Sequence, residues 1–221
     1  MNTSYVSGKD KKSAERAEVI RATALKLFVA EGFGSVSLRR IADISGIQVG
    51  SLYNHIDGKQ QLLFELIFEA EQNLLSALRA AVEKAVEPVT QLGAYVEQYF
   101  IHASLNKELH LLAVREKRCL DEGDATRLKS LLLKHERLIH DVLSRGVQAG
   151  VFKVPSLEFA IKAIWSLLDG MLGSVATNPI DVSICADQLK TCVIRLLGGG
   201  ASVVLVSHDL GGASATSIGR R

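Results

Sequence analysis

The stretch of sequence that decides the fold is GIQVGSLYNHIDGK, from Gly46 to Lys59. Its only apolar residues besides the glycines are Ile47, Val49, Leu52 and Ile56. This apolar area is too small for a helix that is buried on all sides. Glycine at position 46 and the Asp57-Gly58 pair break the helical pattern at the two ends. We therefore predict one short, polar helix over about residues 48–55, suited to contact something outside the protein.

Two helices are predicted before this stretch, and a long one after it. The first begins at an N-cap, Ser13, and its apolar stripe continues to about residue 28. The second, LRRIADIS, is short and is capped by Ser37. Its inward-facing residues are expected to be Leu38, Ile41 and Ile44. Two short helices joined by the turn SGI suit a helix-turn-helix, in which the second short helix enters the major groove of DNA.

Helical periodicity continues through the rest of the chain up to about residue 198. After the long amphipathic helix that starts at Lys59, we expect at least five more helices, with Pro88, Asp124, Ser156 and Asp181 near their first turns. No segment of useful length alternates in the manner of a strand before residue 200. The fold class is therefore all-α. We expect a basic flexible arm over 1–13, a three-helix DNA-binding domain over 14–74, a larger helical domain over 75–198 and a flexible Gly/Ser/Ala-rich tail over 199–221.

Composition narrows the class of protein further. Of the 221 residues, 48% are hydrophobic and 23% are charged, as in a folded globular protein. No apolar run approaches the length of a membrane span, and the polar start of the chain does not resemble a secretory signal. Three scattered cysteines favour a reducing cytoplasm. Up to Lys26 there are six basic and three acidic residues, which suits an arm that lies along nucleic acid or, equally, a solvated tail.

The first third of the chain resembles the DNA-binding domain of the TetR family of bacterial transcriptional regulators. The similarity rests on the motifs at residues 28–33, 37–47, 50–55 and 59–62, which match without a gap, and it covers about residues 14–74. The sequence departs from the family pattern at Ile56, where Phe is usual, and at Gln48, where a small hydroxyl residue commonly caps the helix. Gly58 replaces the usual Ser, Asn or Asp but is still an acceptable N-cap.

The resemblance implies a set of DNA-contacting residues. Base edges would meet Gln48, Val49, Ser51 and Asn54, since Gln and Asn pair with adenine and Val touches a thymine methyl group. Phosphates would meet Tyr53, His55, Lys59 and Ser37, the last two at helix N-termini, and Arg39 or Arg40 would reach a phosphate or a groove edge. Gly50 would allow close approach to DNA, and the alternative is that it packs inside the protein. A single domain of this size makes a small interface, so we expect a homodimer on a palindromic operator in double-stranded DNA.

In TetR-like proteins the larger domain holds an effector pocket, and the last two helices of each subunit form the dimer interface. Apolar stripes through Ile164 and Val193 fit this arrangement, or they merely face the protein's own core. The pocket candidates are polar, sulfur-containing or aromatic residues on apolar helix faces, together with one leucine: Tyr95, Tyr99, His102, Leu112, Arg115, Cys119, Trp165, Asp169 and Met171. A lipophilic effector is expected.

Residues 112–152 faintly resemble TetR-like regulators that respond to acyl-CoA or steroid-breakdown thioesters, and Arg115 would meet a carboxylate or thioester carrier. No spacing suits a metal site, no cofactor is implied, and no nucleophile–base motif indicates an enzyme. Two other classes of function stay open. One is an architectural or cell-cycle DNA-binding protein without an effector, and the other is a helical enzyme or scaffold that kept the motif.

Overall fold

The computed structural model describes residues 8–175 and 182–198, and every regular element among them is helical. The all-α prediction is confirmed. The α-helices are α1 Gly8–Glu31, α2 Leu38–Ile44, α3 Val49–Leu52, α4 Lys59–Glu83, α5 Pro88–Leu105, α6 Lys107–Glu116, α7 Glu122–Gln148, α8 Leu157–Val175 and α9 Val182–Leu196. Two short 3₁₀ helices, η1 Phe33–Ser35 and η2 Lys117–Cys119, follow α1 and α6.

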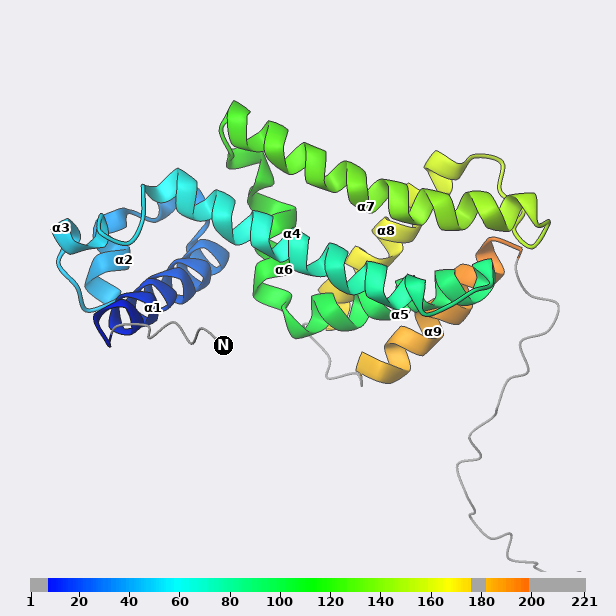
Figure 1. Ribbon diagram of the computed structural model, residues 1–221, viewed down its shortest axis with the longest axis horizontal. Coiled ribbons are helices and arrows are strands. Elements are labelled where there is room, and N and C mark those ends of the chain that lie inside the picture. Colours follow the sequence, from blue (N-terminus) through cyan, green and yellow to red (C-terminus); the bar gives the residue numbers. More distant parts are fainter. Residues whose placement is uncertain (1–7, 176–181, 199–221) are drawn as a thin grey trace, which may run out of the picture.

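The first three α-helices gather at one end of an elongated molecule, and α4 runs from this group into the larger one (Figure 1). The small group has its own apolar cluster, in which Ile20, Phe28, Ile41 and Leu52 are buried. This cluster also takes in Leu112 and Ala113 of α6 and Leu128 of α7. The core of the small domain is therefore completed by residues of the larger one.

The larger domain packs around α5, which lies against α4, α7, α8 and α9. Tyr95 and Phe100 of α5 are completely buried in its core. Gly93 allows α9 to approach α5 closely, since a Cβ atom there would lie 3.1 Å from the Lys190 side chain. The stripe through Ile164 and Leu168 of α8 also faces this core rather than the surface.

Most helix boundaries follow the sequence signals, and three do not. Ser37 caps α2 by accepting a hydrogen bond from the backbone N–H of Arg40 at 3.2 Å, and Pro88 occupies the first turn of α5. However, α1 begins at Gly8 and not at Ser13, so residues 8–13 of the expected arm are helical. Three of these six residues, Lys9, Lys11 and Lys12, are good helix formers, which favours the extension.

The other two differences concern α7 and the short helices. Asp121, and not Asp124, caps α7, because its Oδ1 accepts the N–H of Asp124 at 2.9 Å while Asp124 pairs with Arg127. The helix α3 ends at Leu52, earlier than expected. Ile44 is 55% exposed, because it closes the seven-residue α2 beside a turn instead of lying on the buried face.

The expected break at Asn178-Pro179, the cap at Asp181 and the tail after residue 198 lie outside the described residues. A search of the described helices finds none with the length and apolar character that a membrane span requires.

Candidate functional site

The helix-turn-helix is formed by α2, the turn at Ser45–Ile47, and α3. Gly46 takes a left-handed backbone conformation with φ of 69°, which a glycine adopts without strain, and it redirects the chain between the two helices. The N–H of Ile47 then bonds to the carbonyl of Ala42 at 3.0 Å, which closes the turn. Leu52 is completely buried under α3 and fixes this helix on the domain.

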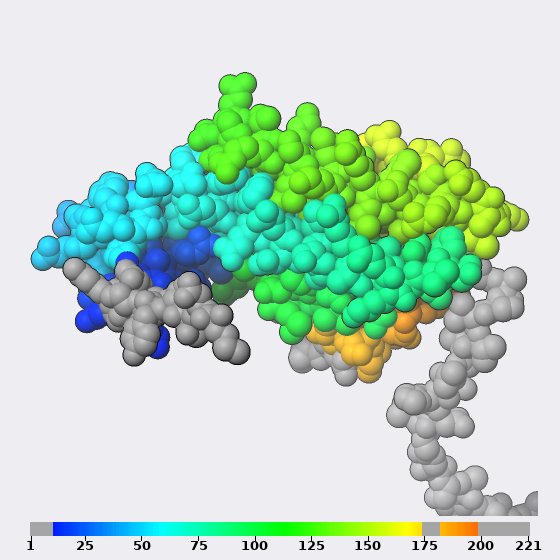
Figure 2. Space-filling view, viewed as in Figure 1, coloured from blue at the N-terminus to red at the C-terminus, as the bar shows by residue number. Residues whose placement is uncertain are grey.

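The opposite face of α3 is turned to solvent at the end of the molecule that is coloured blue to cyan in Figure 2. Gln48, Gly50, Tyr53 and Asn54 are exposed, and Val49, Ser51 and His55 are partly exposed. Tyr53 has 58% of its surface accessible although it is a large aromatic residue. The DNA-binding candidates between Gln48 and His55 are therefore all at least partly accessible to a ligand outside the chain, although Val49 also packs against the core of the small domain.

Gly50 has no packing neighbour. A Cβ atom built at this position would meet no atom of the described chain within 4 Å. The absence of a side chain is therefore not required by packing inside the protein, which was the alternative explanation for this glycine. Because Gly50 has no side chain, the solvent-facing side of α3 has no protruding group at its middle.

Lys59 and Arg40 have partners within the domain. The Lys59 Nζ donates to the carbonyl oxygens of Phe33 and Val36, each at 2.9 Å, and lies 4.2 Å from the centre of the Phe33 ring. This ammonium group therefore ties the start of α4 to the segment before α2, instead of pointing outward. The guanidinium group of Arg40 pairs with Glu31 Oε1 at 2.7 Å, which raises the pKa of Arg40, whereas Arg39 is exposed.

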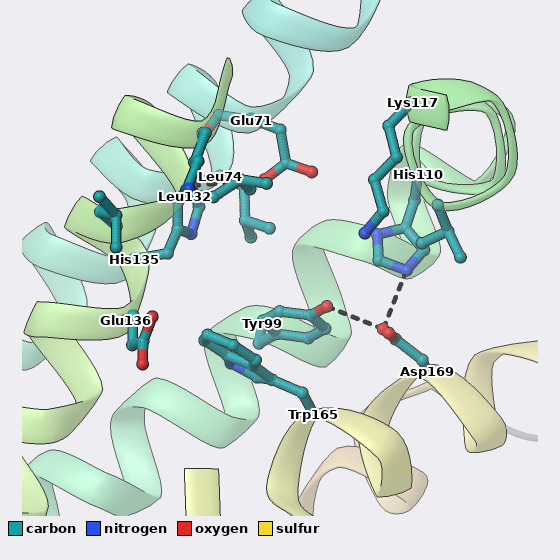
Figure 3. Close-up of a pocket in the computed structure, with 13 residues that line it drawn as sticks. Glu71, Leu74, Tyr99, His110, Lys117, Leu132, His135, Glu136, Trp165 and Asp169 are labelled. Carbon is teal, nitrogen blue, oxygen red and sulfur yellow. Dashed lines mark hydrogen bonds and ion pairs between the residues drawn. The ribbon is translucent and has the colours of Figure 1, made fainter. Parts of the chain in front are cut away.

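A second candidate site is a pocket of about 300 Å³ between α4, α5, α6, α7 and α8 (Figure 3). Trp165, Leu74, Val114, Leu132 and Leu133 supply its apolar wall. Its polar wall contains Glu71, Tyr99, His110, Lys117, Lys129, His135, Glu136 and Asp169. The pocket is therefore amphipathic, with titratable groups from several helices.

Asp169 is the centre of one hydrogen-bond network in this pocket. Its Oδ1 accepts from the Tyr99 hydroxyl at 2.8 Å and from His110 Nε2 at 3.2 Å. Burial raises the pKa of Asp169, but the hydrogen bonds from His110 and Tyr99 outweigh this effect and the net pKa is lowered. The carboxylate is therefore ionised, and Nε2 of His110 must carry a hydrogen because the carboxylate only accepts.

Glu71 and His135 form a second polar group on the opposite wall. The His135 Nε2 lies 3.0 Å from the backbone oxygen of Glu71 and 3.4 Å from its Oε2. Burial lowers the pKa of His135 to about 4, so the ring is neutral near pH 7 and donates its Nε2–H to the carbonyl. Burial also raises the pKa of Glu71, against the effect of His110 and Lys117.

Three of the nine sequence-based effector candidates line this pocket: Tyr99, Trp165 and Asp169. Tyr95 is not among the residues that line the pocket, but its hydroxyl accepts a hydrogen bond from Trp165 Nε1 at 2.9 Å and so helps to hold the indole ring in place. His102 lines a smaller neighbouring pocket of about 60 Å³. The structure does not bring the remaining four to the pocket: Leu112 is in the core of the small domain, Arg115 is exposed, Cys119 packs beside that core, and Met171 packs on the larger core.

Six polar residues of the pocket were not predicted from the sequence: Glu71, His110, Lys117, Lys129, His135 and Glu136. A signal for two of them exists in the helical pattern. Glu71 follows Ile67 and precedes Leu74 and Leu78 on one face of α4, and His135 stands on the stripe of Leu131 and Ile139 in α7. A polar or aromatic residue on an apolar stripe, the feature that distinguishes Tyr99 and Asp169, also occurs at these two positions. Within the described part of the chain, no group of three His, Cys, Asp or Glu residues could hold a metal ion.

Two domain families match the chain. Residues 20–66 match "Bacterial regulatory proteins, tetR family", and residues 85–172 match "Tetracyclin repressor-like, C-terminal domain". Among characterised proteins, the transcriptional repressor KstR2 of Rhodococcus jostii is 29% identical over 144 residues, which is 64% of this chain and 70% of the relative. The KstR2 repressor of Mycolicibacterium smegmatis is 24% identical over 146 residues, 66% of this chain and 71% of the relative.

Solved structures share the fold. A tetR-family regulatory protein from Rhodococcus RHA1 superposes with a TM-score of 0.77 at 24% identity, over 84% of this chain and 98% of the other. The ketosteroid regulator KstR2 of Mycobacterium tuberculosis gives 0.72 at 20% identity, over 83% and 94% of the two chains. Regulators of this family are not enzymes, in agreement with the sequence-based expectation. With its helix-turn-helix and its matching C-terminal domain, the chain belongs to the TetR family of DNA-binding transcriptional regulators.

Proposed function

We propose that the protein is a cytoplasmic, homodimeric repressor that binds a palindromic operator and is released by a small lipophilic effector in the pocket beside Trp165. The observation that carries this proposal is that the pocket and the DNA-binding domain share the same helices. One face of α6 supplies His110 and Val114 to the pocket, and another face supplies Leu112 and Ala113 to the core of the DNA-binding domain. A ligand that displaces α6 must therefore also disturb the domain that carries α3.

A second connection runs through α4. This helix starts at Lys59 in the DNA-binding domain and contributes Glu71 and Leu74 to the pocket about three to four turns later. The Gln60 side chain also donates to the backbone oxygen of Cys119 at 3.1 Å, which joins α4 to the end of η2. Effector binding would shift the population toward a conformation in which the two recognition helices no longer match the operator.

The homodimer is supported by the apolar surface of α8 and α9. Phe159 is 71% exposed, Leu196 71% and Ile184 56%, although all three are large and apolar. An apolar groove of about 410 Å³ lies beside Phe159 and Leu196, and it is also lined by Ile164, Leu167 and Val193 among others. Paired through this face, two chains would place their α3 helices about 34–36 Å apart, one turn of DNA.

The nature of the effector is supported by the apolar wall of the pocket and by related proteins. The transcriptional regulator FadR of Bacillus subtilis shares the fold with a TM-score of 0.66 over 80% of this chain and 97% of its own, at 16% identity, and was solved in complex with stearoyl-CoA. KstR2 is named a ketosteroid regulator. An acyl-CoA-like effector is therefore our first candidate, as the sequence resemblance also implies. An architectural DNA-binding protein would not need such a pocket.

The test begins with selection of genomic DNA fragments on the purified protein. We expect enrichment of one palindrome, whose binding is then followed by fluorescence anisotropy with and without acyl-CoAs and other lipophilic compounds. Release of the operator by a compound that also raises the melting temperature supports the proposal. Broad, sequence-independent enrichment, or an operator complex that no compound bound in the pocket weakens, would favour the architectural alternative.

A further inference from the structure

The hydrogen-bond donors inside the effector pocket are already used. Among the described side chains that line it, the Tyr99 hydroxyl and His110 Nε2 donate to Asp169, and Trp165 Nε1 donates to Tyr95. His135 Nε2 donates to the Glu71 backbone oxygen. None of these four hydrogens is available to a ligand unless an existing bond is broken.

The acceptors, in contrast, are only partly used. Both bonds to Asp169 go to the same oxygen, Oδ1, so Oδ2 keeps its lone pairs. The Glu71 carboxylate has one close neighbour in the described chain, His135 Nε2 at 3.4 Å, whose hydrogen is directed to the backbone oxygen at 3.0 Å. Figure 3 shows the two carboxylates extending from α4 and α8 toward the space between them.

The remaining donors of the lining are the ammonium groups of Lys117 and Lys129. Both residues are exposed, whereas only 17% of the Glu71 side chain is accessible. The free acceptors therefore lie on the buried walls of the pocket, and the Lys117 ammonium, whose charge acts to lower the pKa of both carboxylates, extends toward His110 from the end of α6 (Figure 3). The group of a ligand that enters must suit these free acceptors.

We propose that the effector enters with a hydrogen-bond donor, a hydroxyl or an amine, which binds Glu71 and Asp169 while its apolar part lies against Trp165 and Leu132. This inference rests on the proposed function, because it specifies the ligand of the same pocket: among acyl-CoA-like effectors, it selects those whose acyl chain carries a hydroxyl or an amine. A molecule whose inner end only accepts would face the ionised carboxylate of Asp169, whose free oxygen Oδ2 offers no donor to bind. Sites that pair with a ligand's donor discriminate strongly against analogues that lack it, because their buried acceptors are left unpaired.

The test uses four probes with the same ten-carbon chain and different head groups. Decylamine and decanol carry donors, methyl decanoate is a neutral acceptor, and decanoate is an anionic acceptor. Binding is measured by calorimetry, and DNA release by fluorescence anisotropy on the selected operator. We expect the better of the two donor-bearing probes to bind at least about tenfold more tightly than methyl decanoate and decanoate. The relative affinities of decylamine and decanol show whether the pocket recognises the positive charge or only the hydrogen-bond donor.

Variants then assign the effect to the two carboxylates. Glu71→Gln and Asp169→Asn keep the shape of each side chain and add an amide donor, so the preference for donor-bearing probes should fall about tenfold and methyl decanoate should gain affinity. The matched control is Glu83→Gln, on the exposed end of α4, the helix that also carries Glu71. It should change neither the preference for donor-bearing probes nor the affinity for methyl decanoate. If decanoate binds through the ammonium group of Lys117, Lys117→Gln should lower the affinity for decanoate and leave the affinities for the other three probes unchanged.

Each outcome bears on the inference. Equal or tighter binding of methyl decanoate or decanoate to the wild-type protein, or no binding of either donor-bearing probe, overturns it. A preference that survives in both carboxylate variants also overturns it. If the donor-bearing probes bind as expected but leave operator affinity unchanged, the inference about the pocket stands and the proposed release of DNA fails, so the two failures are distinguishable.

Discussion

At the scale of single residues, a substitution of Gly50 distinguishes an effect on DNA binding from an effect on folding. A Cβ atom at this position meets nothing in the chain, and the residue lies within α3. We expect Gly50→Ala to leave the free energy of unfolding unchanged or to raise it by up to about 1 kcal/mol, because alanine favours a helix. Operator affinity should fall by about tenfold or more, since a loss of about 1.4 kcal/mol at the crowded interface already gives that factor.

The measurements for Gly50→Ala are urea unfolding and fluorescence anisotropy on the selected operator. Gly34 provides the control Gly34→Ala, because a Cβ atom there would also meet no atom within 4 Å, and the residue lies outside the recognition helix. Unchanged affinity in Gly50→Ala would show that α3 does not approach the DNA closely at this residue.

Lys59 is the second residue at which a role in stability and a role in DNA binding can be distinguished by experiment. Its ammonium group makes hydrogen bonds of 2.9 Å to two backbone oxygens, and hydrogen bonds to charged groups contribute about 1.5–3 kcal/mol each. We expect Lys59→Met to lower the free energy of unfolding by roughly 2–3 kcal/mol in urea titrations. Lys84→Met, at the other, exposed end of α4, should leave it unchanged. A stable Lys59→Met protein that has lost only DNA affinity would instead support the phosphate contact that the family resemblance implies.

At the scale of the elements, α7 carries a titratable group on its buried face. The pKa of His135 is lowered by burial from 6.5 to about 4, so the unfolded chain binds the proton more readily between these two values. Stability therefore falls as the pH decreases through this window. The raised pKa of Glu71 acts in the opposite direction, because the folded protein then takes up its proton first. The contribution of His135 to the pH dependence of stability is therefore isolated by comparing the wild type with a variant at this position.

His135→Gln keeps a side-chain N–H for the Glu71 backbone oxygen and cannot titrate. Between pH 7 and pH 5, the free energy of unfolding of the wild type should fall by about 2 kcal/mol more than that of the variant. Urea titrations at several pH values give this difference directly. Parallel pH profiles of the two proteins would mean that His135 is not buried in its neutral form.

At the scale of the whole molecule, the apolar face of α8 and α9 has no cover within the described chain. Phe159 and Leu196 are each 71% exposed, and a groove lies between the two helices beside them. We expect light scattering to give a mass near twice the 23.9 kDa of one chain. Phe159→Asp or Leu196→Asp should give monomers, because a charge buried in an apolar interface is strongly unfavourable.

The control for this prediction is Val86→Asp, since Val86 is 86% exposed but lies between α4 and α5, away from that face. The monomeric variants should also lose operator affinity, because each then contacts one half of the palindrome. Dimers that persist in both aspartate variants would place the interface elsewhere.

The DNA-binding domain could be predicted from the sequence, because the signals that define it are local. The helix-turn-helix depends on caps, glycine turns and spacings within about fifty residues, and Ser37, Gly46 and Leu52 take the places that these signals predict. Such contacts are settled by the backbone preferences of neighbouring residues. What the local pattern did not reveal, even here, is the inward turn of Lys59 toward Phe33, which depends on a contact 26 residues away.

The effector pocket was decided only by tertiary structure. Glu71, His110, His135 and Asp169 are brought together from α4, α6, α7 and α8, across as many as 98 positions of the chain, and periodicity shows which face of a helix is apolar but not which helices meet. Tyr99, Trp165 and Asp169 could be predicted as polar or aromatic residues on apolar faces. Arg115 fits the same rule and is exposed, because the choice between core, surface and pocket depends on the packing of the whole domain.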